Sequence, residues 1–156
     1  MNPRPTIELL ILDARLREWG LPDYQSPMAA AIDLHACVDA TLEIPAGSAA
    51  LLIPTGFALH IGDASVAAMI APRSGMGHKR GLVLGNGIGI LDADYTGQVM
   101  VSAWNRNAAD TPPIRIEPGE RIAQLMFVPI LRPTFRVVTA FTQDSERGAG
   151  GFGSTG

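Results

Sequence analysis

Five short polar stretches, each beside glycines or an apolar run, carry the residues that could do chemistry. They are AAIDLHA (30–36), APRSGMGHKRG (71–81), LGNGIGILDADYTGQVMV (84–101), GERIAQLMF (119–127) and RGAGGFGSTG (147–156). The second stretch places Arg73, Ser74 and Gly75 in succession, so that a guanidinium, a hydroxyl and an approachable backbone are adjacent. This combination suits a phosphate chain. An ordinary basic turn is the alternative interpretation.

The third stretch combines two carboxylates with an aromatic ring. Asp92 and Asp94 are two residues apart, so in an extended strand both project to the same face. Such a pair could bind a metal, or one carboxylate could act as a base while the other is structural. Tyr95 supplies a flat wall, and the surrounding glycines indicate a β-hairpin-like excursion. A solvated acidic turn is the alternative.

Acidic and polar residues in the first and fourth stretches lie within apolar runs. Asp33 interrupts an apolar run, and a buried carboxylate is costly unless it is paired or near a metal. Structural pairing and metal binding therefore both remain open for Asp33. In the fourth stretch, Arg121 and Gln124 lead into an apolar strand.

The glycine-rich end matches a dinucleotide-binding pattern only by accident. GAGGFG, residues 148–153, satisfies G-x-G-x-x-G, but the three residues that follow leave no room for the helix that a Rossmann loop must open. Its composition favours a flexible tail. Arg147 nevertheless is of a residue type that binds phosphate oxygens, and Phe152 is of a type that stacks on a base.

Several kinds of catalysis lack support in the sequence. The three histidines are scattered without zinc-ligand spacing, and no G-x-S-x-G nucleophile elbow is present. The single cysteine, Cys37, is interpreted as a small buried hydrophobe. Carboxylates, phosphate-gripping residues and aromatic rings remain, and these favour water-mediated hydrolysis of a nucleotide phosphate.

Composition predicts a single domain that associates with copies of itself. The chain has 156 residues, of which 47% are hydrophobic and only 17% are charged. A charged fraction below about a quarter indicates that some surface is covered by other subunits. The net charge of −3 predicts no general basic face for nucleic acid. No signal peptide or membrane span is found in the sequence, so a cytoplasmic location is expected.

Short apolar runs separated by glycine and proline predict an all-β fold. The alternation in FALHI is typical of a half-buried strand, and many such runs indicate a sandwich, barrel or jelly roll. One or two short helices are expected at most, over 14–20 and over 74–81, the latter with Ser74 as N-cap. The predicted strands are IELLIL (7–12), FALHIG (57–62), VAAMIA (66–71), VMVSAW (99–104), LMFVPI (125–130) and TFRVV (134–138).

In their order and spacing, the five stretches resemble the five motifs of the homotrimeric deoxyuridine triphosphate nucleotidohydrolases (dUTPases). The resemblance extends from about Ala30 to Gly156. It implies a jelly-roll-like β subunit, a homotrimer with active sites at subunit interfaces, and Mg²⁺-dependent cleavage of dUTP to dUMP and pyrophosphate. It also implies a β domain over 1–146 and a glycine-rich lid over 147–156.

The same resemblance implies roles for individual residues. Asp92 matches the general base, Tyr95 packs under the deoxyribose, and Asp33 reaches Mg²⁺ through water while the substrate's phosphates hold the ion. The substrate-binding residues that the resemblance implies are Arg73, Ser74, Gly75, Asn86, Ile90, Leu91, Asp92, Tyr95, Met100, Gln124, Arg147, Phe152, Gly153, Ser154 and Thr155.

Two other functions are compatible with the same kind of fold. A dCTP deaminase would need a further carboxylate aimed at the cytosine amino group, and Tyr95 and the intact glycine tail argue against it. A non-catalytic trimeric module that binds nucleotides or proteins has no need of Asp92. The sequence therefore favours the hydrolase.

Overall fold

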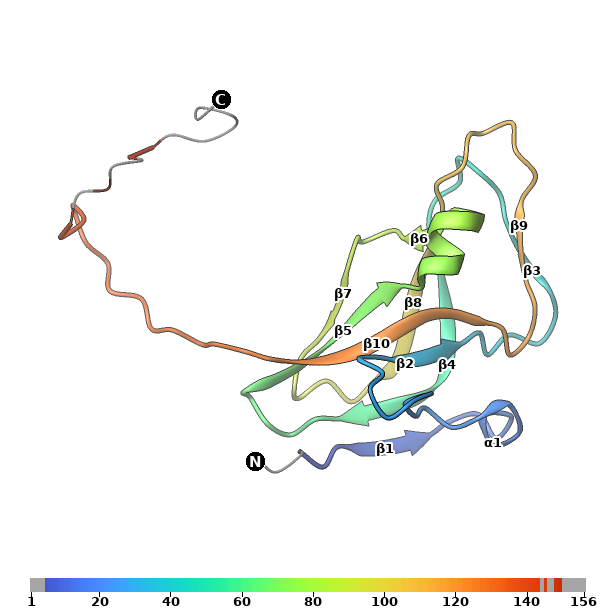
Figure 1. Ribbon diagram of the computed structural model, residues 1–156, viewed down its shortest axis with the longest axis horizontal. Coiled ribbons are helices and arrows are strands. Elements are labelled where there is room, and N and C mark those ends of the chain that lie inside the picture. Colours follow the sequence, from blue (N-terminus) through green and yellow to red (C-terminus); the bar gives the residue numbers. More distant parts are fainter. Residues whose placement is uncertain (1–4, 144, 146–147, 150–156) are drawn as a thin grey trace.

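Two four-stranded antiparallel sheets make up most of the molecule (Figure 1). The computed structural model describes residues 5–143, 145 and 148–149. The first sheet has the order β1-β4-β8-β6 and the second the order β2-β10-β5-β7. The strands of the first sheet are β1 (Glu8–Ile11), β4 (Leu51–His60), β8 (Gln98–Asn105) and β6 (Leu82–Leu84). Those of the second are β2 (Ile32–His35), β10 (Arg121–Pro129), β5 (Val66–Pro72) and β7 (Gly89–Leu91).

A small two-stranded ribbon and two short helices complete the fold. The ribbon pairs β3 (Leu42–Ile44) with β9 (Ile114–Ile116). The helices are α1 (Leu16–Trp19) and a π-helical segment, η1 (Gly75–Arg80). Neither helix in the described residues is long and apolar enough to cross a membrane. The all-β prediction with at most two short helices is confirmed, and both helices lie within their predicted segments.

The core lies between the sheets and follows the alternation of side chains along the strands. In β8, Val99, Val101 and Ala103 are buried, whereas the residues between them are partly exposed. Among the described residues the buried polar side chains all have hydrogen-bond partners; Thr55, for example, donates its hydroxyl hydrogen to the Val99 carbonyl at 2.7 Å. Cys37 is also buried, as the sequence predicted, and burial raises the pKa of its thiol to about 11. The thiol is therefore protonated and unreactive at neutral pH.

Gly56 sits at a break in the pairing of β4 with β8, where the register shifts between Pro54 and Ala58. Its φ is +79°, and a Cβ there would lie 2.5 Å from the sulfur of Cys37. The Gly56 carbonyl accepts hydrogen bonds from the amides of Leu12 and Asp13 at 2.8 and 2.9 Å. The glycine thus lets the chain after β1 pack directly on the centre of β4.

Two expectations about strands are wrong. TFRVV (134–138) pairs with no strand in the described part of the chain, although the other predicted strands all form at least in part. An isolated segment has no partner for its backbone hydrogen bonds. The stretch 84–101 is not a hairpin either, because β7 pairs with β5 whereas β8 pairs with β4 and β6. The chain after β7 instead crosses from the second sheet to the first.

After β10 the chain continues as an extended arm, defined here as residues 131–143, which projects from the body (Figure 1). Its large apolar side chains are open to solvent: Leu131, Phe135 and Val137 are more than 90% exposed. Exposed apolar side chains in such a row form an apolar surface that no other described part of the chain covers.

Replacing Gly56 with alanine should destabilise the protein by about 3 kcal/mol, since the new Cβ meets both an unfavourable φ and the Cys37 sulfur. Gly47→Ala is the matched control, because the φ of Gly47 is +75° and its added Cβ would make only an ordinary contact, 3.5 Å from Ala109 Cβ. It should cost about 1 kcal/mol. Urea unfolding of the two variants measures the difference, and equal losses would rule out the steric contribution.

Candidate active site

Asp33 joins two arginines into one cluster, called here the arginine clamp (Asp33, Arg73 and Arg121). Its Oδ1 forms an ion pair with Arg73 Nε at 2.7 Å, and its Oδ2 accepts a hydrogen bond from Arg121 Nη1 at 3.1 Å. Arg73 Nη1 also donates to the Arg121 carbonyl at 3.1 Å. Both carboxylate oxygens are therefore engaged, and the cluster keeps one net positive charge. This geometry matches the structural pairing considered for Asp33.

Strand pairing brings the clamp together from distant parts of the sequence. Asp33 on β2 is opposite Gln124 on β10, and Gln124 is opposite Ala71 on β5. The Gln124 amide donates to the Pro72 carbonyl at 2.9 Å, directly before Arg73. Three of the five polar stretches thus meet at one end of the second sheet.

Ser74 and Gly75 follow Arg73 at the start of η1. Ser74 occupies the N-cap position as predicted, but within the described chain its side chain makes no capping hydrogen bond. The reason is local: Ser74 has helical backbone angles, φ −54° and ψ −45°, whereas a capping serine is usually in the β region. A Cβ built on Gly75 would meet nothing within 4 Å. The Ser74 hydroxyl and the Gly75 backbone are therefore accessible to a ligand.

A cavity of about 190 Å³ lies beside β7 and the start of β8, and is called here the small cavity. Tyr95 and Asp92 both line it, so a flat ring and a carboxylate face one space. The lining residues that the sequence analysis named are Asn86, Ile90, Leu91, Asp92, Tyr95 and Met100; those it missed are Ile70, Gly89, Gln98 and Val99. Contributions from β5, β7 and β8 show that it forms between the sheets.

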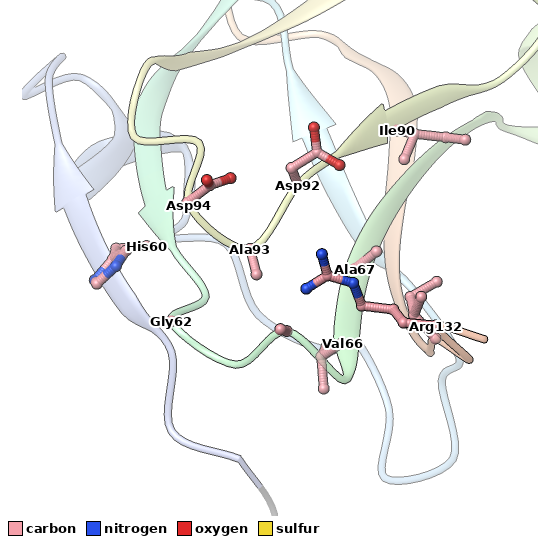
Figure 2. A pocket seen from close by; sticks show the side chains of 11 residues that line it. His60, Gly62, Val66, Ala67, Ile90, Asp92, Ala93, Asp94 and Arg132 are labelled. Carbon is pink, nitrogen blue, oxygen red and sulfur yellow. The ribbon is translucent and has the colours of Figure 1, made fainter. Parts of the chain in front are cut away.

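A second cavity, of about 690 Å³, lies on the other side of Asp92 and is called here the large cavity (Figure 2). Asp92 and Asp94 both line it, but not because they alternate along a strand: β7 ends at Leu91. The Tyr95 amide bonds to the Asp92 carbonyl at 3.1 Å and closes a turn instead. Asp92 is exposed and borders both cavities, which leaves its carboxylate accessible to water.

Two charged or titratable residues of the large cavity, Arg132 and His60, escaped the sequence analysis. Figure 2 shows the Arg132 guanidinium extending into the cavity from the chain after β10, toward Ala93 and Asp92. The Ile130 amide bonds to the Ser65 carbonyl at 2.7 Å and anchors this segment. No motif marks Arg132, because only the pairing of β10 with β5 brings it to Asp92.

The arginine clamp and Asp92 lie at opposite ends of β5. In the pairing of β5 with β7, Ala68 is opposite Leu91, so Asp92 is level with Ala67. Arg73 is six residues further along, which corresponds to roughly 20 Å at about 3.3 Å per residue. One chain therefore does not bring the two groups to the same phosphate.

A sequence model of the dUTPase family matches residues 17–156. The chain belongs to the dUTPase family. The deoxyuridine 5'-triphosphate nucleotidohydrolase of Bordetella pertussis is 56% identical over 151 residues, which are 97% of each chain. The enzyme of the same name from Methylococcus capsulatus is 54% identical over 153 residues, covering 97% of this chain and 98% of that one.

Solved dUTPase structures share the fold. The dUTPase of Staphylococcus bacteriophage 80alpha, solved with dUPNHPP, has a TM-score of 0.83 at 28% identity and covers 98% of this chain and 99% of its own. A mutant dUTPase of phage phi11 of S. aureus, at 22% identity and a TM-score of 0.74, supports the fold alone; it covers 87% of this chain and 98% of its own and was studied for a structural Mg(II) ion.

The residues that the dUTPase resemblance singled out fall into three groups in the structure. One group lines the small cavity with Asp92, and a second, with Arg73, lies at the far end of β5. The third group lies outside the described residues; it consists of Arg147, Phe152, Gly153, Ser154 and Thr155.

His35, next to the clamp, is 8% exposed. Burial lowers the pKa of its imidazole below the ordinary value; Asp33 acts in the opposite sense, and the Arg121 and Arg73 guanidiniums lower the pKa further. The folded protein therefore favours neutral His35.

The free energy of unfolding should fall as the pH drops below about 6.5, because unfolded His35 then takes up a proton that the folded protein resists. His35→Gln removes this proton uptake, so the variant should show a shallower fall. Urea unfolding of both proteins at several pH values between about 7.5 and 5.5 measures the two slopes. Equal slopes would contradict the assignment.

Proposed function

We propose that this protein hydrolyses dUTP to dUMP and pyrophosphate through attack of an Asp92-activated water on the α-phosphorus. The observation that carries the proposal is the small cavity, where six residues named from the family motifs gather around one space with Asp92 at its border. Family membership, with relatives named for this activity over nearly their whole length, supports the same substrate.

Uracil and deoxyribose fit the two sides of the small cavity. Uracil presents an N3 donor between two carbonyl acceptors, and we expect the backbone around Asn86 and Ile90 to Asp92, which lines the cavity, to supply complementary groups. Cytosine reverses part of this pattern and would leave buried hydrogen-bonding groups unpaired. The cost of these unpaired groups makes the site discriminate strongly against cytosine. The Tyr95 ring, under the sugar, leaves no room for a 2′-hydroxyl. Met100 completes the wall.

Asp92 acts as the general base. Its carboxylate is solvent-exposed on a turn that is tied to the body, since the Ala93 carbonyl accepts a hydrogen bond from the Gly62 amide at 2.9 Å. A fixed carboxylate within hydrogen-bond reach of a water can hold that water and remove its proton as it attacks phosphorus. Asp94, on the same turn, shapes the turn.

Arg73, Ser74, Gly75 and Gln124 bind the phosphate chain. The clamp's net positive charge and the accessible Ser74 hydroxyl suit its oxygens. No group of three or more His, Cys, Asp or Glu among the described residues is arranged to hold a metal. Mg²⁺ commonly keeps several waters and binds mainly through substrate phosphates, and Asp33 would reach the ion through water. Bound there, Mg²⁺ would neutralise charge on the departing pyrophosphate.

The active form is a homotrimer with sites shared between subunits. The separation of roughly 20 Å between Asp92 and Arg73 along β5 supports a second copy as the source of the phosphate-binding group. The exposed apolar side chains of the arm supply a surface for contact with another copy. The glycine-rich lid, residues 147–156 beyond the β domain of 1–146, closes over the substrate with Phe152 on uracil and Arg147 on the phosphates. Gly153, Ser154 and Thr155 bind the γ-phosphate.

The protein should release pyrophosphate from dUTP in the presence of Mg²⁺ and should discriminate against dTTP, dCTP and UTP. Asp92→Asn should retain dUTP binding and lose about a thousandfold in kcat, because the amide does not accept the water's proton. Asp94→Asn is the matched control and should keep most of the activity. Absence of pyrophosphate release from the wild-type protein would overturn the function, and near-normal turnover by Asp92→Asn would reassign the base.

Subunits carrying Asp92→Asn and subunits carrying Arg73→Ala should each be inactive alone and should recover activity when mixed in one trimer. Random co-assembly in equal amounts leaves about one quarter of the shared sites with both native residues. Co-expression of the two variants, followed by the pyrophosphate assay, gives the recovered fraction. No recovery in a verified mixed trimer would place both residues of each site in one subunit.

A further inference from the structure

Gly97 lies directly against the ring of Tyr95. A Cβ at Gly97 would lie 2.5 Å from Tyr95 Oη, 2.6 Å from Cζ and 3.0 Å from Cε2. Real Cβ atoms do not approach other atoms this closely, so the ring and a side chain at position 97 exclude one another. The φ of Gly97 is not in the left-handed region, unlike that of Gly87. The ring, and not the backbone conformation, is therefore what demands glycine here.

Tyr95 makes a hydrogen bond at each end of the residue. Its hydroxyl donates to the Gln98 carbonyl at 3.1 Å, and Gln98 pairs with Ala58 on β4. Its own amide is bonded to the Asp92 carbonyl at 3.1 Å. One end of the residue thus belongs to the turn that carries Asp92, and the other is tied to the first sheet.

Only weak restraints keep the ring from moving once Gly97 is replaced. The Tyr95 side chain is partly open to solvent, with the residue 45% exposed. The single hydrogen bond to the Gln98 carbonyl is too weak to hold the ring against an overlap with Cβ. A side chain at position 97 therefore displaces the ring from its place in the lining of the small cavity.

We infer that Gly97 is a positioning residue for substrate specificity: by leaving space for the Tyr95 ring, it sets the rejection of ribonucleotides. The inference rests on the proposed function, in which the ring lies under the deoxyribose. With the ring displaced, the small cavity gains room for a 2′-hydroxyl and loses a packing surface for deoxyribose. The preference for dUTP over UTP then falls.

The test compares kcat/KM for dUTP and for UTP in the wild-type protein, Gly97→Ala and Gly77→Ala. Gly77 is the matched control, since its φ is not left-handed either and an added Cβ would make an ordinary contact, 3.4 Å from Pro72 Cβ. Gly97→Ala should lower the dUTP-to-UTP ratio at least about tenfold, and Gly77→Ala should leave it unchanged. An unchanged ratio in a folded Gly97→Ala protein overturns the inference.

A double-mutant cycle with Tyr95→Ala separates action through the ring from a general effect on the turn. If Gly97 acts through the ring, the double variant should show the same dUTP-to-UTP ratio of kcat/KM as Tyr95→Ala alone. If the effects of the two substitutions on this ratio add, the inference is overturned. If Gly97→Ala alone does not fold, the double variant should fold, because the obstructing ring is absent. Failure of both to fold makes Gly97 a structural residue of the turn and also overturns it.

The inference and the proposed function fail in different ways. A wild-type protein that does not hydrolyse dUTP defeats the function. The relative affinities for dUMP and UMP, measured by calorimetry in the same variants, then test the inference without turnover. A dUMP-to-UMP affinity ratio that is lower in Gly97→Ala than in the wild-type protein supports the role of Gly97, and an equal ratio contradicts it.

Discussion

The pairing of β5 between β10 and β7 is the constraint on which the candidate site depends. Through β10 it brings Asp33, Arg73 and Gln124 to one end of the second sheet. Through β7 it puts Asp92 at the other end. A β-strand is stiff and extended, so strand pairing fixes both the position of each group and the distance between the two groups. The same hydrogen bonds that position each group thus keep it roughly 20 Å from the other within one chain.

Within each of these two groups, local contacts orient the residues that strand pairing brings together. In the arginine clamp, one carboxylate orients two guanidiniums that would otherwise repel one another. On the turn after β7, the carbonyls of Asp92 and Ala93 are bonded to Tyr95 and Gly62, so the turn is held to the body although the Asp92 side chain is exposed. At Gly97, the absence of a side chain leaves the space that the Tyr95 ring occupies.

Local residue chemistry made much of the site predictable. Arg73, Ser74 and Gly75 are adjacent in sequence, so their association needs no tertiary contact, and the stretch around Asp92 and Tyr95 is nearly as compact. Predictions that assumed regular local geometry were less successful. Ser74 does not cap η1 through its side chain, and the carboxylates of Asp92 and Asp94 share a cavity because of a turn and not a strand.

The sequence by itself determined the strand-rich class, the short helices and the identities of most residues with chemistry, because alternation, glycine and proline act over a few residues. Only the tertiary structure decided which strands pair. It therefore decided that Asp33 binds two arginines, that Arg132 reaches the large cavity, and that 134–138 pairs with no strand among the described residues. The physical reason is that backbone hydrogen bonds between strands are much the same for any sequence. The choice of partner depends on how whole sheets bury their apolar faces, and residues distant in sequence settle that together.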